Sequence, residues 1–187
     1  MFYDIVFPKN NEKEFIAMAM RLGFNEIVFV YSNVKDVKRV DGGKVKVRYG
    51  VMGDKKGFLS VMKADDKVRG VLEQIKPDYL YGLEILEYGD SFHYRKSGLN
   101  QVLAKIMAKN NTKLLIPLGE IRKHSGVKKV RFLGRIMQNI RICRKYRVGM
   151  KIVSFATSPY QMKSVKEMGS FGTVLGMDSM QVKKSLE

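Results

Sequence analysis

The sequence predicts an α/β fold in which parallel strands alternate with crossover helices and close into a small (β/α) barrel. Segments with the period of a strand and segments with the period of a helix follow one another along the chain, which is typical of parallel sheets. Seven or eight strand segments can be counted, and this number favours a closed barrel over a doubly wound sheet. Since 187 residues are few for a barrel, which usually needs about 250, we expect one domain over residues 1–187 with some helices shortened or missing.

The first half of the chain contains β-branched and aromatic segments separated by turns and two amphipathic stretches. Gly23 suits the end of the first helix, and Pro77 lies just beyond the second. Asp41-Gly42-Gly43 and Gly53–Gly57 are expected to be loops, and no Gly-rich phosphate motif follows any strand. We predict strands over Phe2–Phe7, Glu26–Tyr31, Lys44–Val51 and Tyr79–Ile85, and helices over Glu12–Leu22 and Asp65–Ile75.

A helix that leads into a buried strand forms the centre of the chain. Ser97 can cap the start of this helix, and Asn110-Asn111 suits its end because Asn tolerates the left-handed conformation. The apolar run Leu114–Ile116 then predicts a strand covered on both faces. The buried stripe of the helix is expected to contain Leu99, Val102, Leu103, Ile106 and Met107.

The last third of the chain continues the alternation. A helical segment at Glu120–Lys123 is broken at Ser125-Gly126. Asp178 and Gln181 have the spacing of a capping box at the start of the closing helix. Ser91–Tyr94 could be a short strand, and Gly172–Leu175 is apolar and ambiguous. We predict helices over Arg131–Arg147 and Asp178–Leu186, a strand over Lys151–Ala156, and a helical turn opening at Ser158-Pro159.

The charge of the chain is strongly basic and unevenly distributed. The formal net charge is +17, and residues 91–151 contain sixteen Lys and Arg but one acid, Glu120. The Arg131–Arg147 helix carries five Arg and one Lys with no acid, although a solvated helix face normally mixes signs. Its buried stripe is expected to contain Phe132, Leu133, Ile136, Met137, Ile140 and Cys143, and the opposite row Arg131, Arg135, Gln138, Ile142 and Lys145. This pattern indicates an external polyanion, and Arg favours phosphate. A membrane surface is disfavoured because the apolar faces are needed for the core and the chain has no Trp.

The single cysteine and the absence of a long apolar run bear on location. Cys143 alone excludes an intramolecular disulfide and fits a reducing cytoplasm. No run of about 18 apolar residues is present, so we expect no membrane span. The chain starts directly with a strand, so we expect no signal peptide and a cytoplasmic location.

The residue types that carry catalysis do not form a recognisable set. His93 and His124 stand alone, outside any metal-binding pattern. Cys143 shares the apolar stripe of its helix, and no glycine elbow surrounds Ser154 or Ser158. Four acids cluster around one strand, and Glu84 is the best candidate because it is predicted within that strand; the others are Asp78, Glu87 and Asp90. We therefore expect no catalytic residue, no metal site and no cofactor bound by this chain.

One long motif carries a family resemblance. Arg95-x-Ser97-Gly98-Leu99-Asn100-x-Val102-Leu103-Ala104-Lys105, followed by Asn110, resembles the protein component 3 family of archaeal ribonuclease P, which is similar to the eukaryotic p30 subunit. The likeness continues through Ser125-Gly126, Met137–Ile140, Val153-Ser154, Ala156 and Leu175–Met177. It implies a TIM-like barrel similar to metal-dependent phosphoesterases of the polymerase–histidinol-phosphatase class. Those enzymes need a His-x-His on the first strand, where this chain has Tyr3–Val6.

The resemblance implies an RNA-binding, non-catalytic subunit of ribonuclease P, the endoribonuclease that removes the 5′ leader of precursor tRNA. Catalysis and the Mg²⁺ ions would belong to the RNA. Expected partners are the ribonuclease P RNA, precursor tRNA indirectly, and other protein subunits, including a small Pop5-type subunit. The alternative function is a metal-dependent phosphoesterase of the polymerase–histidinol-phosphatase type. The expected RNA contacts are Arg95, Lys96, Lys105, Lys109, Arg122, Lys123, Lys128, Lys129, Arg131, Arg135, Arg141, Arg144 and Lys145.

Overall fold

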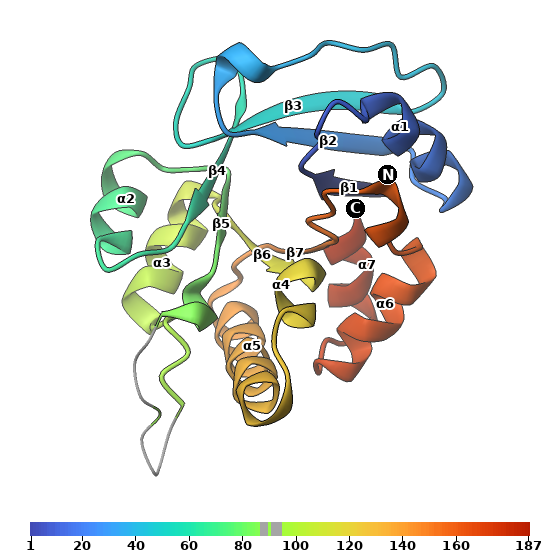
Figure 1. The fold of residues 1–187 in the computed structure, drawn as a ribbon. Coiled ribbons are helices and arrows are strands. Elements are labelled where there is room, and N and C mark those ends of the chain that lie inside the picture. Colours follow the sequence, from blue (N-terminus) through green and yellow to red (C-terminus); the bar gives the residue numbers. More distant parts are fainter. Residues whose placement is uncertain (87–89, 91–94) are drawn as a thin grey trace.

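The strands form one parallel sheet that curls into a nearly closed barrel. A computed structural model describes residues 1–86, 90 and 95–187. Strands pair in chain order from the first to the seventh, and all six pairings are parallel (Figure 1). The strands are β1 (Tyr3–Val6), β2 (Glu26–Tyr31), β3 (Lys46–Met52), β4 (Leu59–Lys63), β5 (Tyr79–Tyr81), β6 (Lys113–Pro117) and β7 (Met150–Val153). The predicted parallel α/β barrel is confirmed.

The chain just after β7 closes the barrel against β1. The backbone N–H of Phe155 donates to the Ile5 carbonyl at 3.1 Å, and that of Phe7 donates to the Ala156 carbonyl at 2.8 Å. The carboxylate of Asp4 accepts from the Ser154 N–H at 2.8 Å. These bonds satisfy backbone groups that an open sheet edge would leave unpaired.

Helices cover the outside of the barrel (Figure 1). The α-helices are α1 (Glu12–Arg21), α2 (Val68–Gln74), α3 (Gln101–Asn110), α4 (Leu118–Arg122), α5 (Gly126–Tyr146), α6 (Val165–Val174) and α7 (Ser179–Leu186). Three short 3₁₀ turns are η1 (Val34–Asp36), η2 (Leu83–Ile85) and η3 (Pro159–Gln161).

The barrel is small because two crossover helices are missing, as the short chain predicted. Only η1 and a loop join β2 to β3, and a loop alone joins β3 to β4. Leu59 at the start of β4 pairs with Gly50 near the end of β3. This stagger leaves the loop a short return path, so two parallel neighbours need no crossover helix.

Several element predictions were wrong. The strand β4 was missed, and the segment Gly172–Leu175, which the sequence left ambiguous, belongs to the end of α6 and the residue after it. The predicted Tyr79–Ile85 strand ends at Tyr81 because Gly82 adopts φ +86°, so Glu84 lies in η2. Ser91–Tyr94 lies outside the described residues.

The central helix has a different cap from the predicted one. Asn100, not Ser97, caps α3, and its side chain accepts from the Leu103 N–H at 2.9 Å. Ser97 is buried instead, and its carbonyl accepts from Asn139 of α5. Asn111 ends the helix in the left-handed conformation as predicted. Val102 was placed in the buried stripe but is 42% exposed.

The apolar interior has two layers. One lies between the sheet and the helices. The other fills the barrel and includes Ile5, Val28, Val61, Leu115 and Val153. Among the described helices, none is both long and apolar enough to cross a membrane.

Candidate nucleic-acid interface

The helix α5 organises the basic part of the surface. It begins at Gly126, five residues before the predicted start, and ends at Arg147 in the left-handed conformation. Phe132, Ile136, Ile140 and Cys143 are buried on its inner side, as the apolar spacing predicted. The helix lies beside α3, so two neighbouring outer helices carry many of the cations of the basic block (Figure 1).

Twelve of the thirteen predicted contact residues are exposed. They belong to the segment before α3, to α3 itself, to the end of α4 and the turn after it, and to α5. The exposed set is Arg95, Lys96, Lys105, Lys109, Arg122, Lys123, Lys128, Lys129, Arg131, Arg141, Arg144 and Lys145. The structure therefore brings most of the predicted cations to the outer surface.

Arg135 is the exception, and its placement on the outer face of the helix was wrong. Its side chain is 8% exposed and donates to Asp90 at 2.9 Å. It also donates to the carbonyls of Glu84 at 3.1 Å and Leu86 at 3.2 Å. A guanidinium enclosed in this way holds the chain after η2 against α5. Periodicity missed it because an Arg whose donors are satisfied by a carboxylate and carbonyls can be buried.

Three exposed cations also have local carboxylate partners. Lys123 pairs with Glu120 at 2.6 Å, Arg131 with Asp90 at 3.6 Å, and Arg144 with Asp178 at 3.7 Å. Arg144 also donates to the Gln181 side chain and the Gly176 carbonyl, which ties α5 to the start of α7. These residues combine a structural contact with an exposed charge.

Nine of the predicted cations have no carboxylate partner within residues 1–86, 90 and 95–187. Arg95 lies against Gly134, where an added Cβ would approach the guanidinium carbon to 2.7 Å. The nine are Arg95, Lys96, Lys105, Lys109, Arg122, Lys128, Lys129, Arg141 and Lys145. Because no acid among the described residues pairs with them, their potential extends into solvent and attracts a polyanion.

The mouth of the barrel was the site implied by the alternative function. Aromatic rings fill it: Phe155 lies edge-on to Phe7 at 4.9 Å and to Tyr81 at 5.0 Å between ring centres. Asp4 of the first strand is buried, and burial raises its pKa to about 6. The hydrogen bonds that its carboxylate accepts act in the opposite direction and lower the pKa. In the part of the chain that the structure describes, no group of three or more His, Cys, Asp or Glu could hold a metal ion.

The other candidate catalytic residues have structural surroundings. His124 packs on Phe132 with ring centres 4.6 Å apart. Burial raises the pKa of Cys143 to about 12, so its thiol is not a nucleophile at neutral pH. Ser154 is buried, and Ser158 precedes η3. His93 and Glu87 lie outside the described residues.

The cluster of acids does not form a catalytic pair either. Asp78 accepts from the backbone and hydroxyl of Ser60, which joins β4 to the start of β5. Asp90 binds Arg135. Glu84 is buried, and burial raises its pKa to about 7. Arg135 binds the backbone carbonyl of Glu84 and not its carboxyl, and the acid that adds to the raised pKa is Glu120, which is itself paired with Lys123.

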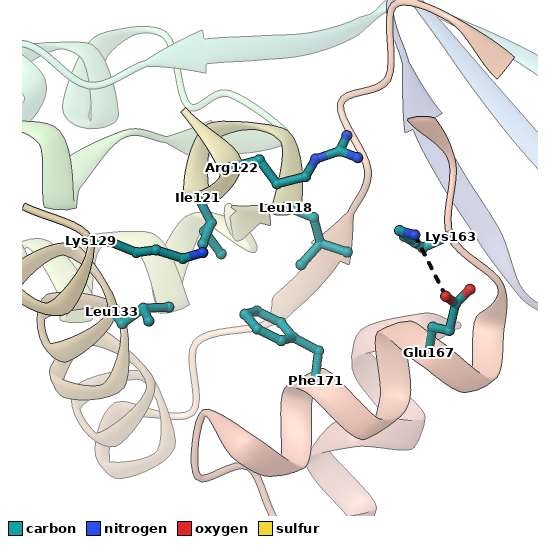
Figure 2. Close-up of a pocket in the computed structure, with 8 residues that line it drawn as sticks. All are labelled: Leu118, Ile121, Arg122, Lys129, Leu133, Lys163, Glu167 and Phe171. Atoms are coloured by element: carbon teal, nitrogen blue, oxygen red, sulfur yellow. Dashed lines mark ion pairs between the residues drawn. The ribbon is translucent and has the colours of Figure 1, made fainter. Parts of the chain in front are cut away.

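The structure adds two residues that sequence reasoning missed. A groove between α4, α5 and α6 brings Lys163 and Phe171 near Arg122 and Lys129 (Figure 2). The sequence contained a signal for α6, because Ser164 and Glu167 form a capping box at its start. That signal would have placed Phe171 on a helix and Lys163 just before it.

Fold and surface together define a class: a parallel (β/α) barrel with an acid-poor cationic face on its outer helices and an aromatic-filled mouth. Within that class the chain belongs to the RNase P subunit p30 family, whose model matches residues 90–187. The matched part starts at the segment before α3 and includes all of α5.

Similar proteins are described as ribonuclease P protein component 3. The one from Methanosarcina mazei is 36% identical over 84 residues, which are 45% of this chain and 35% of that protein. The one from Methanococcoides burtonii is 25% identical and aligns over 91% of this chain and 75% of its own length. The chain thus spans about a third of the length of the Methanosarcina protein and three quarters of the Methanococcoides one.

Solved structures share the fold. A chain in the cryo-EM structure of archaeal ribonuclease P with mature tRNA matches with a TM-score of 0.66 and 19% identity, over 98% of this chain and 86% of that one. Histidinol phosphate phosphatase from Lactococcus lactis, complexed with zinc, L-histidinol and phosphate, matches with a TM-score of 0.56 and 12% identity, over 95% and 94%. Both likenesses show a common barrel architecture.

Proposed function

We propose that this chain is an RNA-binding protein subunit of ribonuclease P. The observation that carries the proposal is the set of exposed cations on α3, α4, α5 and the segment before α3 that have no acid partner among the described residues. This set lies within the segment matched by the p30 family. RNA phosphates are the polyanion that such a surface neutralises, with release of counterions. The contacts are the twelve exposed cations; Arg135 leaves the set because it is enclosed.

We also propose that the chain does not itself catalyse cleavage. The aromatic mouth and the lack of a metal-ligand cluster among the described residues support this. The phosphatase likeness rests on the barrel alone, since β1 has Asp4 buried between backbone donors where those enzymes need His-x-His. The RNA then carries out the cleavage and binds the Mg²⁺ ions, as the family resemblance of the sequence implies.

The proposed partners follow from the same function. The ribonuclease P RNA is the direct ligand, precursor tRNA is reached through it, and a small Pop5-type subunit is the expected protein partner. The proposed location is the cytoplasm, where the single buried Cys143 stays reduced.

RNA binding is tested with a pair of matched double variants. Lys105→Gln/Lys109→Gln removes two exposed charges from α3, and Lys183→Gln/Lys184→Gln removes two from α7, outside the basic block. Filter binding of the ribonuclease P RNA over a salt series should show a slope reduced by about two for the α3 variant. The α7 variant should keep the wild-type slope, and equal slopes for all three proteins would refute the proposed interface.

Catalysis is tested by reconstitution. Precursor tRNA cleavage should require the RNA, and this chain should raise the cleavage rate when added with the other protein subunits. The chain alone, in Mg²⁺ or Mn²⁺, should not hydrolyse phosphodiesters. Turnover by the purified chain together with stoichiometric bound metal would support the phosphoesterase alternative instead.

A further inference from the structure

The groove between α4, α5 and α6 differs from the rest of the cationic surface because it has an apolar floor. Leu118, Leu133 and Phe171 line it and are only half-buried, and Ile121 lies beneath them. Figure 2 shows the Phe171 ring projecting from α6 toward Leu118 and Leu133. Apolar side chains that keep solvent contact in a concave site gain free energy when a ligand covers them.

The rim of the groove is cationic. Arg122 and Lys129 are exposed at its edge, and Lys163 faces them from the segment before α6 (Figure 2). Among the described residues Lys129 has no ion-pair partner, and Arg122 donates one bond to the Gln161 carbonyl at 3.3 Å. The guanidinium of Arg122 therefore keeps most of its donors for a ligand.

One acid lines the groove, and its charge is already compensated. Glu167 pairs with Lys163 at 3.6 Å and accepts from the Ser164 N–H at 2.8 Å and its hydroxyl at 2.9 Å. These hydrogen bonds, with the nearby lysine, hold the pKa of Glu167 below its usual value, so it remains an acceptor at neutral pH. The four charged lining residues sum to +2.

We propose that this groove binds one unpaired nucleotide of RNA, with the base on Phe171 and the phosphates at Lys129 and Arg122. This proposal rests on the RNA-binding function proposed above, and it adds the place at which the protein contacts a base. A volume of about 290 Å³ suits one planar group rather than a helix of a protein partner. An aromatic ring beside phosphate-binding cations is the arrangement with which proteins hold single-stranded nucleic acid.

The test compares two RNA hairpins of equal length and charge, one fully paired and one with a single-nucleotide bulge. Fluorescence anisotropy should give at least about five-fold tighter binding of the bulged hairpin, which corresponds to about 1 kcal/mol from one stacked base. The variant Phe171→Leu keeps an apolar side chain but removes the ring. It should bind both hairpins equally, with the salt slope of the wild type.

The variant Tyr146→Leu is the matched control, because it removes a ring from α5 outside the groove, where Tyr146 contacts Gln101. It should keep the preference for the bulge. A 2-aminopurine in the bulge should be quenched by the wild type and by Tyr146→Leu but not by Phe171→Leu. Thermal melts followed by circular dichroism check that each variant is folded.

The outcomes separate the two proposals. If Phe171→Leu retains the preference for the bulge, the nucleotide site is refuted and the groove is left for a protein side chain. If wild-type protein binds both hairpins equally and Lys105→Gln/Lys109→Gln weakens both, RNA binding stands and the nucleotide site falls. If no protein binds either hairpin, or the ribonuclease P RNA, the proposed function fails and the groove site fails with it.

Discussion

The buried guanidinium of Arg135 contacts the half-buried Asp90, and both its Nε and its Nη2 lie 2.9 Å from the same carboxylate oxygen. Arg131, one turn earlier on α5, approaches the other oxygen of Asp90 at 3.6 Å and is 55% exposed. Burial alone would raise the pKa of Asp90, but hydrogen bonds from Arg135 and the Lys96 N–H and the positive charges of both arginines hold it below its usual value. The two arginines that contact Asp90 therefore have different roles: Arg135 is enclosed and structural, whereas Arg131 keeps an exposed charge.

The first prediction uses this pair. Arg135→Met should lower the free energy of unfolding by about 3 kcal/mol, since it removes the principal donor to Asp90 and the donor to the carbonyls of Glu84 and Leu86. Arg131→Met should cost under about 1 kcal/mol, because its ion pair is exposed. Urea unfolding measures both changes. In RNA binding the order should reverse: at a temperature where both are folded, Arg131→Met should weaken affinity and Arg135→Met should leave it nearly unchanged.

Arg135 also shows where reading the sequence reached its limit. The helical period identified the inner side of α5 through Phe132, Ile136 and Ile140, and all three are buried. The same period assigned Arg135 to the outer face, because periodicity treats every Arg as solvated. Its burial depends on Asp90 and on the carbonyls after β5, which are 45 to 51 residues distant in sequence. A local sequence pattern cannot show that the donors of an Arg will find hydrogen-bond acceptors so far away in the sequence.

The barrel itself was predictable, and its shortest parts were not. Parallel order and reduced helices followed from the alternation of segments and from the chain length. The strand β4 is Leu-Ser-Val-Met-Lys, too short and too mixed to show a period, and it is a strand because it pairs with β3 and β5. The groove at Phe171 combines three helices, so only the fold could assemble it.

The second prediction concerns a lysine inside the barrel. Lys151 is 1% exposed, and its ammonium nitrogen lies 3.3 Å from the centre of the Tyr3 ring. Burial lowers the pKa of Lys151 to about 7, although Asp4 raises it. The unfolded chain, with a pKa near 10.5, therefore binds this proton more tightly, so stability should rise with pH from about 7 to about 10.5.

Replacing Lys151 by Met should remove that slope and stabilise the protein. The expected gain is on the order of 2 kcal/mol at pH 7, after the loss of the contact with Tyr3. Urea unfolding at pH 6, 8 and 10 measures it, and the gain should shrink toward pH 10. Lys63→Met, at an exposed position of β4, is the control, because Lys63 is not among the charges that shift the pKa of Lys151, and it should leave the slope in place. Destabilisation by Lys151→Met at every pH would contradict the prediction.

The third prediction concerns Glu84 and the opposite pH window. Burial raises its pKa to about 7, and Glu120 adds to the shift against a backbone hydrogen bond. Within the described residues its Oε1 has no hydrogen-bond partner. The folded protein thus binds the proton more tightly than the unfolded chain, whose pKa is near 4.5, and stability should fall as the pH rises from about 4.5 to 7.

Glu84→Gln should therefore stabilise the protein by about 1–3 kcal/mol at pH 8 and have little effect at pH 4.5. Asp4, whose pKa is raised to about 6, should keep part of the slope in this variant. Glu120→Gln should remove only a small part of the slope, because burial and not Glu120 is the main cause of the raised pKa of Glu84. Thermal unfolding across pH 4.5–8 measures the effect. Parallel curves of stability against pH for Glu84→Gln and the wild type would contradict the prediction.

The fourth prediction uses Cys143 as a reporter of α5. This residue is the only cysteine, it is fully buried, and burial raises its pKa to about 12. A thiol reagent should therefore react only when α5 leaves the barrel, at a rate set by the open fraction. Reaction in denaturant gives the unprotected rate, and the native protein should be slower by at least about a thousand-fold.

RNA binding should slow the reaction of Cys143 further. A ligand that binds only the folded protein lowers the open fraction by a factor of one plus the ratio of its concentration to Kd. This factor is about a hundred when the ligand concentration is a hundred times Kd. Ribonuclease P RNA should produce this slowing with the wild type, and less of it with Lys105→Gln/Lys109→Gln at the same RNA concentration. Because Cys143 faces inward while the exposed cations of α5 face outward, the RNA cannot shield the thiol by contact. A rate that is unchanged when the RNA is bound would mean that the binding does not require α5 to be docked on the barrel.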